Sequence, residues 1–323
     1  MITTPLNVYD EIATNRRKTI LILLLFPLVL AGLIYATVFL VFYFVGLDAQ
    51  QATQAINFQE INLISTIAAS ITVALAIIWA FVSWFGGDHI VLDSAGAQEI
   101  SRATHPEIFV LVENLTIATG LPLPRIYIMD DESLNAFATG RDPEHASLAL
   151  TKGIIKRLNR AELEGVIGHE LGHIANRDIR LTMLVATYIG AISLMGQILI
   201  RLAASSSKNR RGKNGGQITI LLLILGFVFI IYGAVFAPLI MFALSRRREF
   251  QADATSAYMT RNPLALASAL EKISTDSRVE ALDGKSMVSA ACIAHAGAPQ
   301  ASLTSLFATH PPIEERIAKL RAM

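Results

Sequence analysis

Residues 160–176 of the 323-residue chain read RAELEGVIGHELGHIAN, and this stretch decides the fold. Its apolar residues recur along one side, which predicts a helix. Positions i and i+4 of a helix lie one turn apart on the same face, so His169 and His173 can present two imidazole nitrogens to one metal ion. Glu170 is offset by one residue and can reach a water on that metal. The pattern predicts a metal site, whereas the simpler interpretation is a surface helix with two ordinary histidines.

A third ligand is needed, because a catalytic zinc site usually has three protein ligands and one open position. No histidine follows His173 at the spacing of a three-histidine metalloprotease motif. The segment REFQADAT at 248–255 places Glu249 and Asp253 at positions i and i+4. A solvated acidic pair is the simpler interpretation of so weak a pattern. We favour Glu249 as the third ligand because it lies at the end of the hydrophobic hairpin that begins just after His173, and we expect Asp253 to hold a ligand histidine in place.

The composition is that of a membrane protein. Hydrophobic residues make up 53% of the chain and charged residues only 16%, whereas a soluble domain has about 25% charged residues. A formal net charge of +1 argues against a nucleic-acid partner, and the single cysteine excludes an internal disulfide. A helix needs about 20 apolar residues to cross a bilayer. Four uncharged stretches reach that length, at residues 20–47, 61–87, 181–200 and 214–245.

The positive charges near these stretches predict how the chain crosses the membrane. Residues 16–18 read Arg-Arg-Lys, and the loop 48–60 has no Lys or Arg. Since cytoplasmic loops carry the excess of positive charge, we expect the N-terminus and the chain from Asp88 onward to be cytoplasmic. Five positive charges lie between the third and fourth stretches, so that hairpin either crosses against the charge rule or lies re-entrant or flat on the membrane. In each case His173 and Glu249 end on the same side.

The expected domains follow from these stretches. Residues 1–87 form an N-terminal anchor with two transmembrane helices, and residues 179–245 form a hydrophobic hairpin. Residues 88–178 and 246–323 form one soluble domain, split by the hairpin. Within it, periodicity and turn residues predict helices at 106–119, 160–176, 246–260, 263–274 and 311–322, and strands at 125–130, 135–140 and 147–151.

Taken together, HELGH at 169–173, the long hydrophobic hairpin, the ExxxD segment at 249–253 and His-Pro-Pro at 310–312 resemble the HtpX family of membrane zinc metalloproteases. These enzymes are gluzincins, related to the CAAX prenyl endopeptidases, and the resemblance covers nearly the whole chain. It implies an α+β fold: a mostly helical integral membrane protein with four hydrophobic helices and a zincin-like catalytic domain with a small β-sheet.

The resemblance also implies an activity and a set of site residues. The activity is endoproteolysis of misfolded or damaged membrane proteins at the cytoplasmic side of the bacterial plasma membrane, as a multi-pass enzyme of membrane-protein quality control. One Zn²⁺ per chain would be held by His169, His173 and Glu249, with Glu170 as the catalytic acid/base. Asp253 would be the acid that supports a ligand histidine.

The sequence also offers candidates for the oxyanion donor, a partner of the carboxylates and the substrate cleft. His310 precedes Pro311 at a predicted helix start, so it is a candidate donor to the oxyanion of the reaction, or else a capping histidine. Arg316 either pairs with an active-site carboxylate or is solvated. The resemblance implies that the strand NAFATG lines the substrate cleft, where small residues would let a peptide backbone approach. The residues implied are Asn135, Ala136, Phe137 and Ala138.

Three other functions fit less well. An intramembrane protease would carry HExxH inside an apolar span, but Glu164 and Asp178 flank the motif closely. A transporter or channel would have ionisable groups within its spans, and the four uncharged stretches hold none. A purely structural zinc site would have no use for Glu170.

Overall fold

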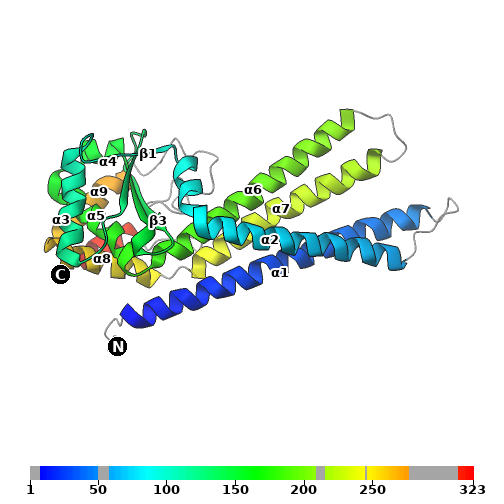
Figure 1. Ribbon diagram of the computed structural model, residues 1–323, viewed down its shortest axis with the longest axis horizontal. Coiled ribbons are helices and arrows are strands. Elements are labelled where there is room, and N and C mark those ends of the chain that lie inside the picture. Colours follow the sequence, from blue (N-terminus) through cyan, green and yellow to red (C-terminus); the bar gives the residue numbers. More distant parts are fainter. Residues whose placement is uncertain (1–7, 50–57, 209–214, 244–245, 276–311) are drawn as a thin grey trace. The chain divides into compact units, whose positions relative to one another are not determined.

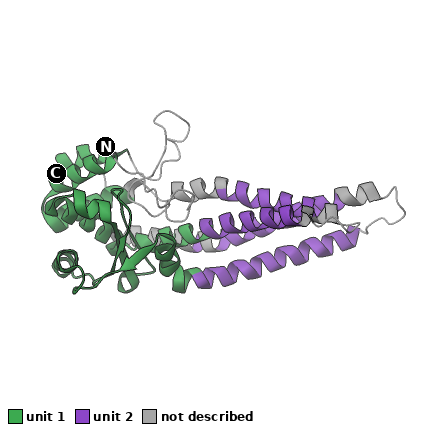
Figure 2. Cartoon of the chain, turned by 90° about the horizontal axis from the view of Figure 1, so that it is seen from above, with its two compact units in different colours: residues 1–19, 83–188, 238–323 green, residues 20–82, 189–237 purple. Residues whose placement is uncertain are grey.

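The structure is a computed structural model, and it describes residues 8–49, 58–208, 215–243, 246–275 and 312–323 (Figure 1). It divides into two compact units (Figure 2). The first unit comprises residues 1–19, 83–188 and 238–323, and the second comprises residues 20–82 and 189–237.

Four long helices account for the second unit and continue beyond it. They are α1 (Val8–Ala49), α2 (Phe58–Ser94), α6 (Asp178–Lys208) and α7 (Gly215–Ala243). Three segments are long and apolar enough to cross a membrane, at Leu24–Tyr43, Phe58–Ser94 and Asp178–Ser205. Within the described residues, α7 contributes a shorter apolar helix, Thr219–Gly233. The predicted membrane protein is therefore confirmed, with three clear candidate spans and a shorter fourth hydrophobic helix.

Helices α6 and α7 approach each other closely through glycines. A Cβ atom added at Gly226 would lie 2.8 Å from Cγ1 of Ile200 and 3.3 Å from the carbonyl oxygen of Gly196. Small residues at such crossings let membrane helices pack backbone against backbone, where burial of apolar area alone gives no driving force.

The first unit is built on a four-stranded mixed sheet. Its strands are β1 (Ala97–Glu99), β2 (Arg125–Met129), β3 (Ala136–Gly140) and β4 (Ala146–Thr151), in the order β1-β2-β4-β3. Strand β2 runs parallel to β4, with Tyr127 opposite Ala149. The pairs β1–β2 and β3–β4 are antiparallel, with Phe137 opposite Ala149 in the second pair. Strand β3 therefore forms one edge of the sheet.

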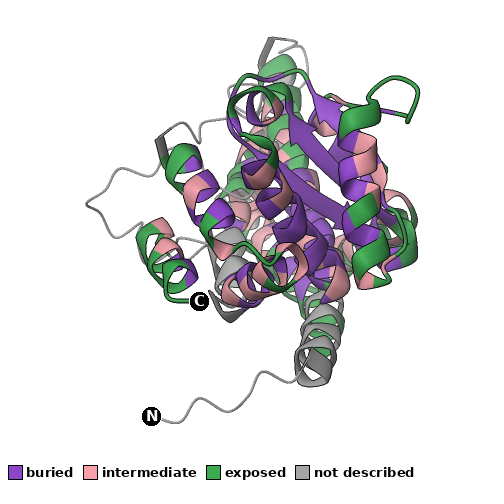
Figure 3. Ribbon diagram, turned by 90° about the vertical axis from the view of Figure 1, so that its left-hand side faces the viewer, coloured by how far each residue is buried: buried purple, intermediate pink, exposed green. Residues whose placement is uncertain are grey.

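Helices supply the rest of the core of this unit, and Figure 3 shows which residues are buried. They are α3 (Pro106–Thr119), α4 (Lys152–Arg157), α5 (Arg160–Ala175), α8 (Arg246–Thr260), α9 (Pro263–Thr275) and α11 (Ile313–Arg321), with a short 3₁₀ turn, Pro143–His145, before β4. The predicted helices and strands are all present with small differences at their ends. The α+β fold with a small sheet is thereby confirmed.

The start of α5 is fixed by a reciprocal cap. The side chain of Asn159 accepts a hydrogen bond from the Glu162 backbone N–H (3.0 Å), and the Glu162 carboxylate accepts one from the Asn159 N–H (2.8 Å). This capping box satisfies two of the backbone donors that a helix start leaves without partners.

Two glycines let α8 and α9 approach α5. A Cβ atom at Gly172 would lie 3.1 Å from the Cα of Ala252 on α8, and one at Gly165 would lie 3.0 Å from the backbone of Leu266 on α9. Side chains at these positions would push the helices apart, which costs typically about 1–3 kcal/mol in a packed core. The glycines thus bring the ExxxD segment of α8 beside the HExxH segment of α5.

Glu162 links the cap to α9 and makes the stability of the first unit dependent on pH. Its carboxylate is 3% exposed and accepts hydrogen bonds from Lys272 and Ser268, both at 2.7 Å. Burial alone would raise the pKa of Glu162, but the bonds from Lys272, Ser268 and the Asn159 N–H outweigh it and lower the pKa. A carboxyl whose folded pKa is lowered contributes stability above its unfolded pKa and loses it as the pH falls through the folded pKa.

We therefore expect Glu162→Gln to destabilise the protein at pH 7 by about 1–2 kcal/mol, the value of a charge-assisted hydrogen bond. The difference from wild type should shrink as the pH falls below about 4.3, where the unfolded carboxyl is protonated. Denaturant unfolding in detergent, with chelator present at each pH, measures it. A difference that stays constant from pH 7 to pH 3.5 would contradict this assignment.

Candidate metal centre

Helices α5 and α8 bring three potential metal ligands together. His169 is fully buried, Glu249 is buried, and His173 is half-buried. Nε2 of His169 lies 3.2 Å from Nε2 of His173 and 3.6 Å from Oε2 of Glu249. Nε2 of His173 lies 3.7 Å from Oε1 of Glu249. One ligand atom from each residue thus lies within 4.8 Å of the other two.

The spacing of these atoms fits a tetrahedral metal ion. Zinc binds nitrogen and oxygen at about 2.0–2.1 Å, so two ligands of a tetrahedral ion lie about 3.3 Å apart. The three distances between donor atoms, 3.2, 3.6 and 3.7 Å, lie close to that value. Two imidazoles and one carboxylate leave a fourth position open, as in catalytic zinc sites.

Asp253 orients the first histidine. Nδ1 of His169 lies 2.9 Å from Oδ1 of Asp253, so the ring faces the other ligands with Nε2. Burial and the charge of Arg316 would lower the pKa of His169, but the carboxylates of Asp253 and Glu249 outweigh them and raise it to about 9. The same two carboxylates favour a metal cation between the donor atoms.

Arg316 on α11 is fully buried and holds Asp253. Its Nε and Nη2 donate to the two oxygens of Asp253 at 2.9 and 2.7 Å, and its Nη1 lies 3.7 Å from Oε2 of Glu249. Burial would raise the pKa of Asp253, but the guanidinium lowers it to about 2. Of the two roles considered for Arg316 from the sequence, the structure has the paired one.

An acid that the sequence did not single out orients the second histidine. Nδ1 of His173 lies 3.2 Å from Oδ2 of Asp178, which is 2% exposed and is the first residue of α6. Nη1 of the buried Arg248 lies 3.8 Å from the other oxygen of Asp178. Arg177 has a φ of +57°, a conformation uncommon outside glycine, and it forms the tight turn that returns Asp178 to the histidine. In the sequence, the sign of this role was one acidic residue, Asp178, between HELGH at 169–173 and the uncharged stretch that begins at residue 181.

The remaining predicted residues occupy different places. Glu170 follows His169 on α5 and is 3% exposed. Asn135 and the residues Ala136, Phe137 and Ala138 of β3 are buried at the sheet edge that packs against α5. His310 lies outside the described residues.

Comparison with known proteins supports a metallopeptidase. The model of Peptidase family M48 matches residues 102–323. A Protease HtpX homolog of Bacteroides fragilis (strain YCH46) is 42% identical over 315 residues, which cover 95% of each chain. One of Dictyoglomus turgidum is 39% identical over 319 residues, which cover 99% of this chain and 96% of the relative. The crystal structure of S. mikatae Ste24p is 17% identical, with a TM-score of 0.46, and covers 78% of this chain and 57% of that chain.

The matched region contains both histidines and the glutamate of the metal cluster, and the apolar helices precede and interrupt it. The relatives match along nearly their full length, including the N-terminal helices. The chain belongs to peptidase family M48, and it is a membrane metalloprotease related to the HtpX proteases.

Proposed function

We propose that this chain is a zinc endopeptidase that cleaves misfolded or damaged membrane proteins on the cytoplasmic side of the bacterial plasma membrane, as part of membrane-protein quality control. The observation that carries the proposal is the cluster of His169, His173 and Glu249, with donor atoms spaced for a tetrahedral ion. Glu170 directly follows the ligand His169 on α5. The family to which the chain belongs is a family of peptidases.

The roles of the residues follow from their chemistry. His169, His173 and Glu249 would hold one zinc ion, which supplies an acidified water molecule and polarises the scissile carbonyl. Glu170 takes the proton from the attacking water and passes it to the leaving amine. His310, proposed from the family resemblance, donates a hydrogen bond to the developing oxyanion.

The substrate would bind as an extended strand along β3. Strand β3 is an edge of the sheet, so its outer side is where a peptide would add to the ladder. The small side chains of Ala136 and Ala138 leave room for a close backbone; Asn135 precedes them and Phe137 lies between them. Helix α5, which carries the ligand histidines, packs against this strand.

The membrane setting supports membrane proteins as substrates. We propose residues 1–87 as the anchor, 179–245 as the hairpin, and 88–178 with 246–323 as the catalytic domain. The positive residues 16–18 and the absence of Lys and Arg from the loop 48–60 support a cytoplasmic catalytic domain. The apolar segment of α6 begins only five residues after His173 in the sequence, which favours peptide bonds close to the bilayer. Cleavage of unfolded soluble casein together with failure to cleave every membrane substrate offered would refute this preference.

Metal content and proteolysis test the zinc assignment directly. The wild type, purified in detergent without chelators, should carry one zinc per chain, lose cleavage on chelation and regain it with zinc. Glu249→Gln should lose most of the bound zinc, whereas Glu113→Gln, a change at a half-buried residue of α3 outside the metal cluster, should keep it. Cleavage by the metal-free wild type, or full zinc occupancy of Glu249→Gln, would rule out the proposed site.

We expect the substitution Asp178→Asn to weaken zinc binding and to leave the fold intact. In Asp178→Asn the amide oxygen can still accept from Nδ1 of His173, but the charge that makes the histidine a better ligand is lost. We expect zinc affinity, measured by competition with a chelator, to fall about 10–100-fold, as for other partners of metal-bound histidines. Asp142→Asn is the matched control, because Asp142 pairs with Nδ1 of His145 at 2.6 Å, outside the metal cluster. Equal zinc affinity of the two variants would contradict a role for Asp178 in zinc binding.

A further inference from the structure

Arg248 directly precedes the ligand Glu249 on α8 and is buried, with 6% of its surface exposed. Its ion-pair partner among the described residues is Asp178, whose Oδ1 lies 3.8 Å from Nη1. Nε and Nη1 of Arg248 make no hydrogen bond within the part of the chain that the structure describes. Because a buried charge is costly without an opposite charge beside it, the burial of Arg248 depends on Asp178.

The length of this contact indicates how Arg248 acts. A separation of 3.8 Å is too long for a hydrogen bond, so the guanidinium acts on Asp178 through its charge. Asp178 is placed by the backbone: it is the first residue of α6 and follows the left-handed turn at Arg177. Its other oxygen, Oδ2, lies 3.2 Å from Nδ1 of His173. One carboxylate is thus shared between a ligand histidine and a guanidinium.

This sharing affects how strongly the histidine binds a metal ion. A carboxylate beside the ring N–H makes a histidine a more basic and stronger ligand. A positive charge on the far side of that carboxylate draws part of the negative charge away and weakens the effect. Removal of Arg248 should therefore strengthen His173 as a ligand, whereas removal of Asp178 weakens it.

Arg316 differs from Arg248, although it also pairs with an acid that faces a ligand histidine. It donates two hydrogen bonds to Asp253, at 2.9 and 2.7 Å, and it is fully buried. A change at Arg316 therefore alters the geometry of the site as well as its charge. Arg248 makes only the longer contact with Asp178, so its charge can be removed with the smaller change in geometry.

The buried charges of the metal centre are opposite to those of a divalent cation. Among the described residues, four carboxylates and two guanidiniums are buried on or next to the cluster: Glu170, Asp178, Glu249, Asp253, Arg248 and Arg316. Burial would lower the pKa of Arg316, but Asp253, Glu249 and Glu170 raise it, so Glu170 belongs to the same group of charges. With neutral histidines the formal charge of this group is −2, and without Arg248 it would be −3. The larger negative charge attracts a divalent cation more strongly.

We propose that Arg248 limits how tightly this centre holds its metal ion, because its guanidinium offsets part of the charge of Asp178 that would otherwise strengthen His173. The inference rests on the proposed zinc site. Arg248 supplies no ligand atom and acts through Asp178. A metal ion that receives less charge from its ligands remains the stronger Lewis acid, which is the property that polarising a scissile carbonyl requires.

The zinc affinity of the full chain in detergent, measured by competition with a chelator, tests the proposal. Arg248→Met and Arg248→Gln both remove the charge and should bind zinc about tenfold more tightly than the wild type, at the low end of the effects of partners of metal-bound histidines. Two neutral side chains of different polarity are used so that a folding defect of one variant does not decide the result. Arg248→Lys keeps the positive charge and should stay within about twofold of the wild type.

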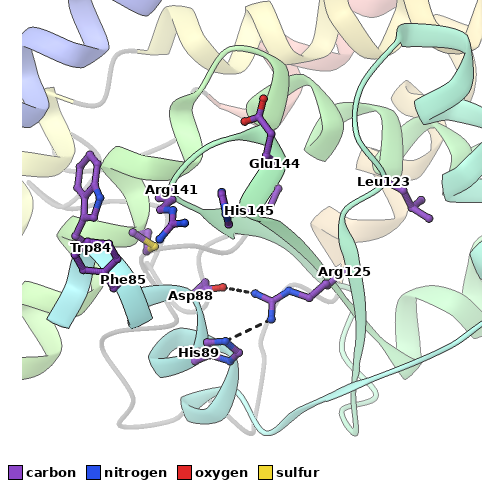
Figure 4. Close-up of a pocket in the computed structure, with 11 residues that line it drawn as sticks. Trp84, Phe85, Asp88, His89, Leu123, Arg125, Arg141, Glu144 and His145 are labelled. Atoms are coloured by element: carbon purple, nitrogen blue, oxygen red, sulfur yellow. Dashed lines mark hydrogen bonds and ion pairs between the residues drawn. The ribbon is translucent and has the colours of Figure 1, made fainter. Parts of the chain in front are cut away.

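Arg125→Met is the matched control. Arg125 pairs with Asp88 at the wall of a cavity of about 350 Å³ that no residue of the metal cluster lines (Figure 4). The change removes an arginine from an Arg–Asp pair of the same unit, outside the metal cluster, and should leave zinc affinity unchanged.

The double variant Asp178→Asn/Arg248→Met tests whether Arg248 acts through Asp178. Without the charge of Asp178 there is little for the guanidinium to offset, so most of the tenfold gain should disappear in the Asp178→Asn background. The same gain in both backgrounds would exclude the route through Asp178. Unchanged or weaker zinc binding by the neutral variants would overturn the proposal and leave Arg248 with a role in packing alone. Absence of zinc from the wild type would instead refute the proposed zinc site on which the inference rests.

Discussion

Glu170→Gln is expected to lower the rate of peptide hydrolysis about 10²–10⁴-fold while leaving one zinc per chain bound. Glutamine has nearly the volume of glutamate, so the buried position on α5 is refilled without a cavity. It cannot take a proton from water, so the variant keeps the ligands of the metal and loses the base. Since Glu170 is absent from the ligand cluster, zinc content and peptide binding should match the wild type.

Single-turnover cleavage and metal analysis of the same preparation measure this separation. Glu164→Gln is the matched control, because Glu164 lies on the same helix in an exposed pair with Arg160 and should leave the rate unchanged. If Glu170→Gln retained more than a tenth of the wild-type rate, another group would be the base. If it lost its zinc, Glu170 would belong to the metal site instead.

The parts of the molecule that follow from local sequence were predicted well. Helix α5 spans Arg160–Ala175 where the periodicity predicts 160–176, since a capping residue and an apolar stripe are both local signals. The i, i+4 spacing correctly predicted that the two histidines lie on one face, because helix geometry places residues i and i+4 one turn apart on the same side. Short elements were missed: β1 has three residues and α4 has six, too few for a period to show.

Other features depend on the tertiary structure and left no local trace. Arg316 reaches Asp253 across 63 residues of sequence, and only the packing of α11 decides that it is buried rather than solvated. Asp178 faces His173 because Arg177 adopts a left-handed conformation, which no periodic pattern encodes. Helix α2 continues to Ser94, beyond the end of its apolar run at 87, because charged residues end a membrane span without ending a helix.

Arg316→Met is expected to destabilise the metal-free protein by about 3–5 kcal/mol, the cost of removing one partner of a buried ion pair. Methionine fills much of the space but leaves two buried carboxylates, on Asp253 and Glu249, without the guanidinium that faces both. Burial would raise the pKa of Asp253, but the guanidinium of Arg316 lowers it to about 2, so the carboxylate of Asp253 is ionised at neutral pH. Denaturant unfolding in detergent measures the loss. The control is Arg321→Met, a change on the same helix as Arg316 that removes an exposed pair with Glu271 of α9.

A bound metal ion should change how much Arg316→Met destabilises the protein. This change distinguishes a role of Arg316 in the metal site from a role in packing alone. A divalent cation between His169, His173 and Glu249 would replace part of the positive charge that Arg316 supplies to the buried carboxylates. Arg316→Met should therefore cost the zinc-loaded protein less stability than the metal-free protein. Adding Asp253→Asn to Arg316→Met should recover part of the loss, since only the carboxylate of Glu249 then remains without the guanidinium. An equal loss with and without zinc, and no recovery in the double variant, would mean that Arg316 acts only through the packing of α11.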